Sequence, residues 1–157
     1  MKITIRKATS DDAEQILALL SPYVKKGILL PRSKEEIEKT SDSFTVAIAQ
    51  KKIIGVVSQY KYNANLFEIR SLAVDSRYHH KGIGKQLVEH AVNDILQQHK
   101  DAKIFCLTYN PSFFKKVGFM AVAKETLPDK IWKDCQYCQH RDNCTETAMV
   151  YSLRSRG

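Results

Sequence analysis

Two glycines in a basic loop are the residues of this chain whose spacing most directly suggests chemistry. Gly82 and Gly84 lie in the segment HHKGIGK, which follows an apolar stretch ending at Val74 and precedes apolar residues at helical spacing. A strand, a glycine loop and a helix in this order direct unpaired backbone N–H groups and the positive end of the helix dipole towards one place. Glycine also lets a ligand approach the backbone closely, because it has no Cβ. The sequence therefore predicts an anion-binding loop at 79–85.

The glycine spacing excludes two well-known phosphate loops. A P-loop needs four residues between its glycines and then Gly-Lys-Ser/Thr, whereas a single residue separates Gly82 from Gly84. A dinucleotide fingerprint needs G-x-G-x-x-G, and Leu87 occupies its third glycine position. From the residues alone, the segment is either another kind of anion loop or a solvated basic turn between a strand and a helix.

The loop resembles the acyl-CoA pyrophosphate loop of the GNAT superfamily of N-acetyltransferases, Q/R-x-x-G-x-G/A. The matching residues are His79, His80, Lys81, Gly82, Ile83 and Gly84, with Lys85 directly after them. His79 stands where the family usually has Gln or Arg, and His80 where many members carry an extra glycine. The resemblance implies that acetyl-CoA is the co-substrate and that backbone N–H groups of this loop hold its diphosphate. It also implies that the pantetheine arm lies along the preceding strand, at Leu72, Ala73 and Val74.

Acetyl transfer from a thioester to an amine needs a base for the amine, a donor for the oxyanion and an acid for the thiolate. Family members often place a base carboxylate where this chain has Glu68. Strand alternation predicts that Glu68, Arg70 and Leu72 share one face. By resemblance, the backbone N–H of Leu72 is the oxyanion donor. The alternative for Glu68 and Arg70 is an outward-facing ion pair at the start of a strand.

The family's second motif, N-x-x-A-x-x-x-Y-x-K-x-G-F, corresponds here to FFKKVGF at 113–119. Phe114 stands at the position of the Tyr that protonates the thiolate, and it has no proton to give. Either Tyr109 serves as the acid or the thiolate leaves unaided into water. By resemblance, Asn110 and Phe114 contact the cofactor, although core packing explains the Phe114 ring as well.

The FFxKxGF form resembles the acetyltransferases of N-acetylglutamate synthesis, the first step towards arginine. Three further stretches point to this branch, namely GILLPRS at 27–33, EIRSLAV at 68–74, and LPDKIWKDC with two more cysteines and TETAM at 127–149. The long synthases carry an amino-acid-kinase domain ahead of the acetyltransferase. Neither that domain nor the arginine-feedback site that goes with it is expected for this chain, which resembles the short, stand-alone form. The resemblance implies direct transfer to the α-amine of L-glutamate.

Glutamate carries two carboxylates, and the planar fork of arginine binds carboxylates bidentately. Arg32, which follows the stiff Pro31, and Arg70 are the candidate ligands. Ser33 is a third candidate through its hydroxyl, although capping of a helix explains it equally well. The alternative for Arg32 is an ordinary surface arginine at the rim of a loop.

Three cysteines and a histidine fall within ten residues of one another near the end of the chain. Cys135 and Cys138 have the Cys-x-x-Cys spacing that lets two thiolates chelate one ion, and His140 or Cys144 would complete a tetrahedral zinc site. The strong zinc signal is two such pairs, and only one is present. Three reduced thiols packed under the loop, or a redox-active pair, are the alternatives, and acetyl transfer itself needs no metal.

Length and composition limit the number of domains, the compartment and the kinds of partner that can be expected. The chain has 157 residues, 43% of them hydrophobic, and a formal net charge of +8, which predicts one domain over 1–157. There is no long apolar run and no signal-peptide pattern at the start, so a cytoplasmic protein that does not enter a membrane is expected. Lys and Arg are spread along the chain rather than clustered with aromatic residues, which argues against nucleic acid as a partner. We expect a monomer or homodimer, and the resemblance implies a small amino-acid substrate.

The order of expected elements is βααβββαβαββ. Strands are expected at 3–6, 44–49, 53–62, 66–74, 103–107, 119–123 and 147–153, and helices at 13–21, 34–40, 83–96 and 113–117. The expected caps of the first helix are Thr9, Ser10, Asp11 and Asp12, with Glu14 three residues after Asp11, and the helix is expected to end before Pro22. This order matches the GNAT fold, an α/β (α+β) architecture with a mixed, mostly antiparallel sheet, splayed central strands and flanking helices.

Three other functions remain open on the sequence alone. A family member of this kind can act on another small amine or on a protein. A basic zinc-knuckle module on nucleic acid and a CoA-binding regulator without activity, the latter suggested by Phe114, are the non-enzyme alternatives.

Overall fold

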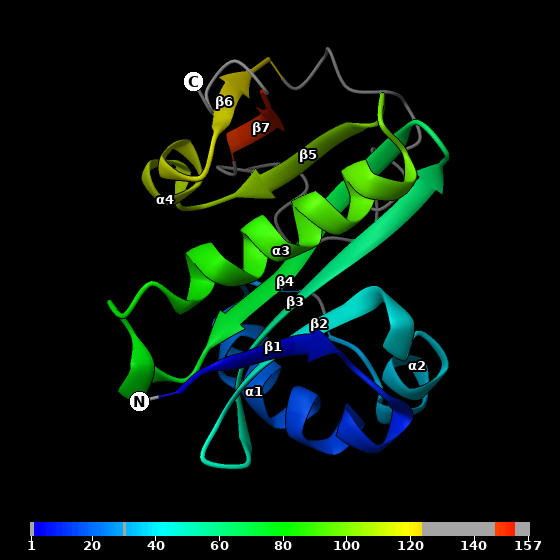
Figure 1. Ribbon diagram of the computed structural model, residues 1–157. Coiled ribbons are helices and arrows are strands. Elements are labelled where there is room, and N and C mark those ends of the chain that lie inside the picture. The colour runs from blue at the N-terminus through cyan, green and yellow to red at the C-terminus, as the bar shows by residue number, and fades with distance from the viewer. Residues whose placement is uncertain (1, 30, 124–146, 153–157) are drawn as a thin grey trace.

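The computed structural model describes residues 2–29, 31–123 and 147–152. Seven described strands form one sheet in the order β1-β2-β3-β4-β5-β7-β6 (Figure 1). All neighbouring strands are antiparallel except the parallel pair β4 and β5, so the predicted mixed, mostly antiparallel sheet is confirmed. The strands are β1 Thr4–Lys7, β2 Phe44–Ala49, β3 Lys52–Asn63, β4 Leu66–Val74, β5 Lys103–Thr108, β6 Phe119–Val122 and β7 Thr147–Tyr151.

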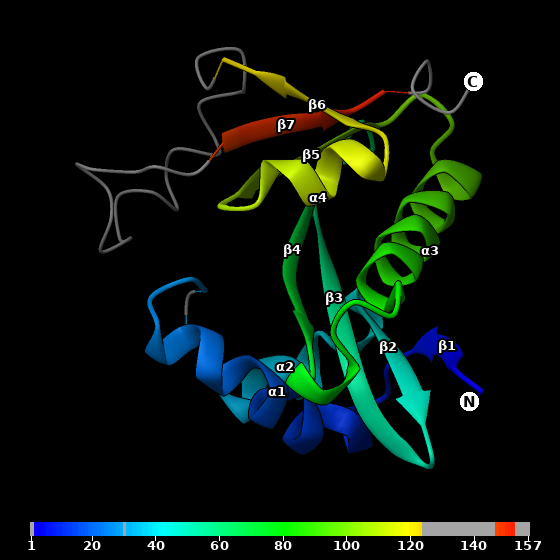
Figure 2. The same ribbon diagram turned by 90° about the vertical axis from the view of Figure 1, so that its left-hand side faces the viewer.

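Helices cover both faces of this sheet. The longest, α3 Ile83–Gln98, lies on one face of β2–β4, and α1 Ala13–Lys25 and α2 Lys34–Lys39 lie on the other (Figure 2). The short α4 Pro111–Lys116 packs near β6 and β7. Apolar residues at helical spacing on α3, from Ile83 to Ile95, are buried against the sheet in the largest core cluster. No helix within the described ranges is both long and apolar enough to cross a membrane.

The two central strands separate after a short contact. Pairing between β4 and β5 covers only Leu66–Glu68 and Lys103–Phe105, although β4 runs on to Val74 and β5 to Thr108. Over the same stretch β4 stays paired with β3 as far as Val74. The predicted splay of the central strands is therefore confirmed, and it leaves one edge of β4 facing an opening rather than a neighbouring strand.

A bulge in β4 overturns the prediction that Glu68, Arg70 and Leu72 share a face. Arg70 is paired with Ser58 and Ala73 with Val56, so Ser71 and Leu72 together lie opposite one residue of β3. Ser71 has a φ of 53°, which is left-handed backbone. The extra residue reverses the alternation. As a result Leu72 packs against the core under α3, with Phe67 and Ile69, and faces away from Glu68.

The first helix continues through Pro22, so the expected end before that residue is wrong. The helix ends at Lys25, and Gly27 then adopts a φ of 74°. The Ile28 N–H donates to the Tyr23 carbonyl at 2.9 Å and the Gly27 N–H to that of Val24 at 3.0 Å, the two bonds of a Schellman motif. Proline removes one helical N–H, but it leaves the glycine to set the end of the helix.

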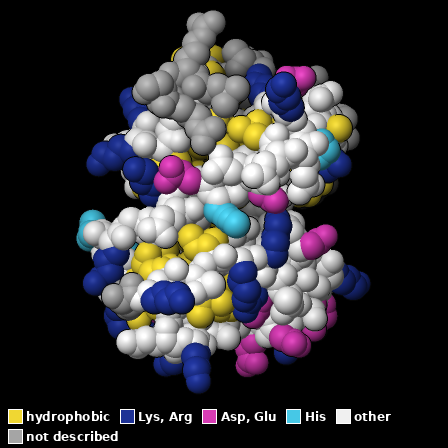
Figure 3. All heavy atoms as spheres, in the orientation of Figure 1, with side chains coloured by type: hydrophobic (Ala, Val, Ile, Leu, Met, Phe, Trp, Pro, Cys, Tyr) yellow, Lys and Arg dark blue, Asp and Glu magenta, His cyan; other side chains and the backbone are white. Residues whose placement is uncertain are grey.

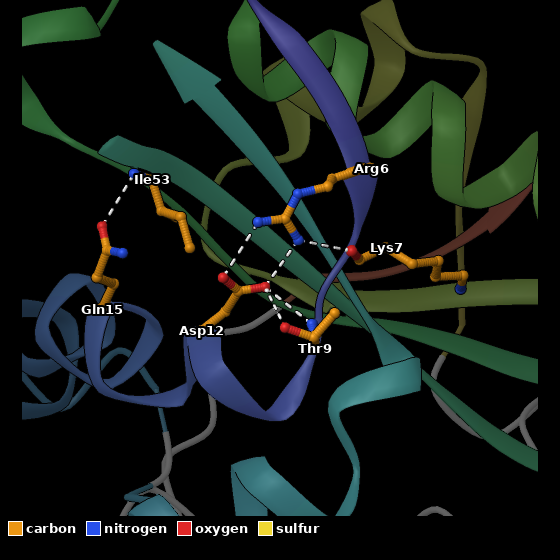
Figure 4. A network of polar contacts seen from close by, with 6 residues as sticks. All are labelled: Arg6, Lys7, Thr9, Asp12, Gln15 and Ile53. Carbon is orange, nitrogen blue, oxygen red and sulfur yellow. Dashed lines mark hydrogen bonds and ion pairs between the residues drawn. The ribbon is translucent and has the colours of Figure 1, made fainter. Parts of the chain in front are cut away.

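The start of α1 is held by Asp12, the last of the four expected caps (Figure 4). The Asp12 carboxylate accepts from the Thr9 N–H at 2.8 Å and from both terminal nitrogens of Arg6, at 2.7 and 3.1 Å. The Arg6 hydrogen bonds are the main reason that the pKa of Asp12 lies below its ordinary value. One turn further on, Gln15 accepts from the Ile53 N–H at 3.1 Å and ties α1 to β3.

The remaining boundaries differ little from expectation. The helix α4 begins at Pro111, two residues before the predicted 113, because proline fits the first turn of a helix and Asn110 caps it. The strands β6 and β7 end at Val122 and Tyr151. The other predicted strands and helices agree with the structure to within about two residues.

Candidate active site

The splay of β4 and β5 opens into a cleft of ≈ 1100 Å³. It brings together most of the residues that the sequence predicted for the site. Those expected at the cofactor are Leu72, Ala73, Val74, His79, His80, Gly82, Ile83, Gly84, Lys85, Asn110 and Phe114. Those expected to bind the acceptor or to act in catalysis are Arg32, Glu68, Arg70 and Tyr109. Among the described candidates, Lys81 and Ser33 do not line it.

At one end of the cleft lies the N-terminus of α3. Gly82 precedes the helix with a φ of 77°, and the first helical bond runs from the Gln86 N–H to the Gly82 carbonyl at 3.1 Å. The N–H groups of 83–85 therefore have no acceptor within the helix. The first turn carries Lys85 and no acidic residue, the opposite of what a helix dipole favours. This local charge suits an anionic ligand.

The two glycines of the loop do different work. A Cβ on Gly84 would lie 3.3 Å from the Phe113 ring, so this glycine permits the close approach of α3 to α4. A Cβ on Gly82 would meet nothing within 4 Å, but the φ of Gly82 is positive, and residues with a side chain rarely adopt that conformation. One position is a packing requirement and the other a backbone requirement.

The His79 side chain turns back towards the sheet. Its Nε2 lies 2.8 Å from the Val74 carbonyl oxygen, to which the Tyr23 hydroxyl also donates at 3.1 Å. Tyr23 comes from α1 and lines the cleft, and the sequence analysis did not predict it. The only sequence signal for it was an aromatic residue near the end of a helix that was expected to stop earlier.

The other end of the cleft holds a charged cluster. Arg70 Nε donates to Glu68 Oε1 at 2.6 Å, and the Tyr62 hydroxyl donates to the same oxygen at 3.0 Å. Glu68 is only 7% exposed. Glu68 and Arg70 therefore form the ion pair that was the alternative to a catalytic role for Glu68. This ion pair lines the cleft and does not face outward. Tyr62 is a second residue that the sequence analysis missed.

Arg32 and Ser33, neighbours in sequence, have different surroundings. The Arg32 guanidinium lies over the Phe44 ring, 5.5 Å from its centroid, and Arg32 lines the cleft. The Ser33 hydroxyl accepts from the Glu36 N–H at 3.1 Å and caps α2. The structure thus gives Ser33 the capping role that the sequence analysis weighed against substrate binding.

The end of β5 and the segment that follows it form one wall of the cleft. Phe114 is buried between Phe113 and Phe119, with ring centroids 5.0 and 5.3 Å away. Tyr109 lines the cleft and is 39% exposed. Thr108, not predicted for the site, is buried in the same wall and accepts from the Asn110 N–H at 2.9 Å.

The predicted zinc ligands Cys135, Cys138, His140 and Cys144 lie outside the described residues. Within the ranges that the structure does describe, no three His, Cys, Asp or Glu side chains are grouped so as to hold a metal ion. The Cys106 side chain is buried in the wall of the cleft.

A family model described as an acetyltransferase (GNAT) domain matches residues 40–121, from the start of the central strands to β6. An uncharacterized N-acetyltransferase of Chlorobaculum tepidum is 40% identical over 149 residues, which is 95% of this chain and 96% of the relative. The chain belongs to the GNAT acetyltransferase family. It is accordingly an N-acetyltransferase, as the sequence predicted.

Other GNAT relatives are larger proteins. An amino-acid acetyltransferase of Pseudomonas putida is 30% identical over 125 residues, which cover 79% of this chain but 29% of that protein. The N-acetylglutamate synthase of Neisseria gonorrhoeae, solved with coenzyme A and N-acetyl-glutamate, superimposes with a TM-score of 0.84 at 25% identity, over 96% of this chain and 35% of that one.

A solved structure of matching length comes from Mycobacterium tuberculosis and was determined in complex with CoA. It superimposes with a TM-score of 0.80 at 22% identity, over 96% of this chain and 99% of that one. The superposition shows that the two proteins share a fold.

Proposed function

We propose that this chain transfers the acetyl group of acetyl-CoA to the α-amine of L-glutamate, the entry reaction of arginine biosynthesis. The observation that carries the proposal is a cleft with the N-terminus of α3 at one end and Glu68, Arg70 and Arg32 at the other. The similarity to amino-acid acetyltransferases and to an N-acetylglutamate synthase supports an amino acid as the acceptor.

The co-substrate would lie along the cofactor half of the cleft. Its diphosphate would accept from the N–H groups of 83–85, with Lys85 adding positive charge. Its pantetheine arm would run along the edge of β4 that β5 leaves open beyond Glu68, where extended backbone can bind a chain as another strand would. The protein supplies position here, and the thioester supplies the activated acetyl group.

The chemistry asks three things of the protein. Glu68 takes a proton from the substrate ammonium, directly or through water, and the freed amine attacks the thioester carbonyl. The oxyanion that forms is stabilised by the backbone N–H of Leu72, in the bulge of β4 where pairing with β3 is interrupted. When the C–S bond breaks, the thiolate takes a proton from Tyr109 or leaves unaided into water, and the new amide nitrogen loses its extra proton to solvent.

The acceptor would be held by its carboxylates. Arg32 and Arg70 both line the cleft, and each guanidinium lies over an aromatic ring, Phe44 at 5.5 Å and Tyr60 at 4.2 Å. Stacking restricts the guanidinium planes, so less entropy is lost when a carboxylate binds. Two such arginines suit a dicarboxylic amino acid.

A nucleic-acid role finds no support on the visible face of the molecule. Figure 3 shows Lys and Arg side chains spread over both halves of this face and interspersed with Asp and Glu. A nucleic-acid interface would gather them into a stripe or patch.

The decisive experiment measures thiol release from acetyl-CoA by the purified full chain, with a panel of amino acids as acceptors. We expect the highest kcat/KM with L-glutamate and a product with the mass of N-acetylglutamate. Glutamine and aspartate are the informative neighbours, since they alter one carboxylate or its distance. Preference for a basic or apolar amino acid would contradict the glutamate assignment, and no thiol release with any amine would contradict the proposed reaction.

A further inference from the structure

The hydroxyl of Tyr62 lies at the centre of the charged cluster, and the chemistry above gives it no role. It donates to Glu68 Oε1 at 3.0 Å and accepts from Arg70 Nη2 at 2.9 Å. Arg70 Nε donates to the same Glu68 oxygen at 2.6 Å. The three side chains therefore close a ring of hydrogen bonds, and two donors converge on one carboxylate oxygen.

The sheet explains why these residues meet. The strands β3 and β4 are neighbours (Figure 1), and their register places Tyr60 opposite Glu68 and Ser58 opposite Arg70. Tyr62 follows Tyr60 by two residues and so returns to the same face. The pairing shifts between Lys61 and Asn63, which leaves Tyr62 outside the regular register and free to lean towards Glu68.

The Tyr62 ring is also held by its neighbours, with the Tyr60 ring centroid 4.8 Å away and the Arg70 guanidinium 5.8 Å away. Its centroid lies 5.8 Å from that of Phe105 on β5, in an apolar cluster with Leu66. A ring fixed in this way has few torsions left, so its hydroxyl is a stiffer reference point than the long Arg70 side chain. The ring of hydrogen bonds is thus anchored to the β5 side of the cleft through Tyr62.

We propose that Tyr62 is a positioning residue for Glu68. Its hydroxyl holds Oε1 and, with Arg70, sets the plane of the carboxylate that faces the acceptor amine. This role rests on the proposed function, because it takes Glu68 as the base. Hydrogen bonds to a charged acceptor are short and strongly oriented, and a base misplaced by a fraction of an ångström transfers protons poorly.

The test begins with Tyr62→Phe, which keeps the ring against Phe105 and removes only the hydroxyl. We expect kcat to fall about tenfold, because a hydrogen bond to a charged group is lost, while the KM for acetyl-CoA stays unchanged. Tyr151→Phe is the matched control. It keeps the ring against Phe119 and removes a hydroxyl from a tyrosine that does not line the cleft, so it should leave kcat unchanged.

A double-mutant cycle shows whether Tyr62 acts through Glu68. In a Glu68→Ala background, the further change Tyr62→Phe should lower kcat little, because the base it positions is gone. The same cycle read by thermal unfolding tests the contact without turnover, and the two losses of stability should be less than additive. Wild-type kcat in Tyr62→Phe, or additive effects in both cycles, would overturn the role of Tyr62. Absence of turnover by the wild-type protein with every amine would instead contradict the proposed function.

Discussion

The two ends of the cleft differ in whether backbone or side chains form them. The cofactor end consists mainly of backbone, namely the N–H groups of 83–85 and the open edge of β4, and its residues follow one another closely in the chain. The acceptor end consists of side chains from β3, β4 and the segment after α1, with Tyr62, Glu68, Arg70 and Arg32 placed by packing and pairing. A backbone site tolerates changes in most side chains, whereas each side chain of the acceptor end carries a separate contact. Substitutions at the two ends should therefore differ in what they alter.

The largest effect is expected at the acceptor end, in Glu68→Gln. The amide keeps the shape of the side chain but cannot take the proton of the amine, so kcat should fall about 10²-fold or more. Calorimetry should show unchanged acetyl-CoA affinity. Glu89→Gln, the same change on the outward face of α3, is the control and should turn over normally. Near-normal kcat in Glu68→Gln would move the base to another residue.

At the cofactor end, Gly84→Glu should weaken acetyl-CoA binding by about one to two orders of magnitude, since it adds bulk and negative charge where the diphosphate would lie. Gly84→Gln adds almost the same bulk without charge and separates the two causes, because a Cβ here already meets Phe113 at 3.3 Å. Titration calorimetry of the folded variants gives both affinities. Unchanged affinity in Gly84→Glu would show that the diphosphate does not bind at this loop.

A smaller and more selective effect is expected for Arg32→Lys. The charge remains but the planar fork is lost, so the KM for glutamate should rise about tenfold with little change in the affinity for acetyl-CoA. Steady-state kinetics with each substrate varied in turn will show it. Arg32→Ala should raise the KM further, and normal glutamate turnover in that variant would refute both the carboxylate role and the substrate assignment.

The smallest effect concerns stability and the helix that carries Tyr23 to the cleft. The pKa of Asp12 lies below its ordinary value of 3.8, chiefly through the Arg6 hydrogen bonds, so the stability it contributes is present above that value and is lost as the pH falls through the lowered one. Asp12→Asn should cost about 1 kcal/mol at pH 7, since Arg6 is partly exposed. Chemical unfolding from pH 7 to pH 2 should show the wild-type advantage shrinking at the acid end. A difference that stays constant across this range would contradict the role of the Asp12 charge.

The difference between the two ends also explains what could be predicted from the sequence. Gly82, Gly84 and the helix after them are local in the chain, so their spacing and periodicity were enough to predict the strand, the loop and the helix. The wrong prediction for Leu72 came from the bulge at Ser71, because nothing in the letters EIRSLAV marks a residue with positive φ. Tyr62 was missed because its partners are set by the register of β3 and β4, which a single strand does not encode.

The same contrast applies to the helices. The end of α1 was misplaced because Pro22 is the stronger breaker in isolation, while the Schellman bonds that hold the helix beyond it depend on Gly27. The cap of α2 at Ser33 was predictable, since donor and acceptor lie three residues apart. The local cap at Ser33 was accessible from the sequence, the local end of α1 was obscured by Pro22, and the contacts between strands were not accessible.

The left-handed backbone of Ser71 also restricts how this protein can vary. At a φ of 53°, glycine and asparagine adopt the conformation readily, serine does so with some strain, and β-branched side chains are strongly disfavoured. Position 71 of β4 therefore disfavours valine, isoleucine and threonine, which are common in strands. Any substitution that straightened the strand would turn every residue from Leu72 to Val74 to the opposite face. The backbone therefore restricts position 71, and a randomised library should keep small, turn-forming residues there.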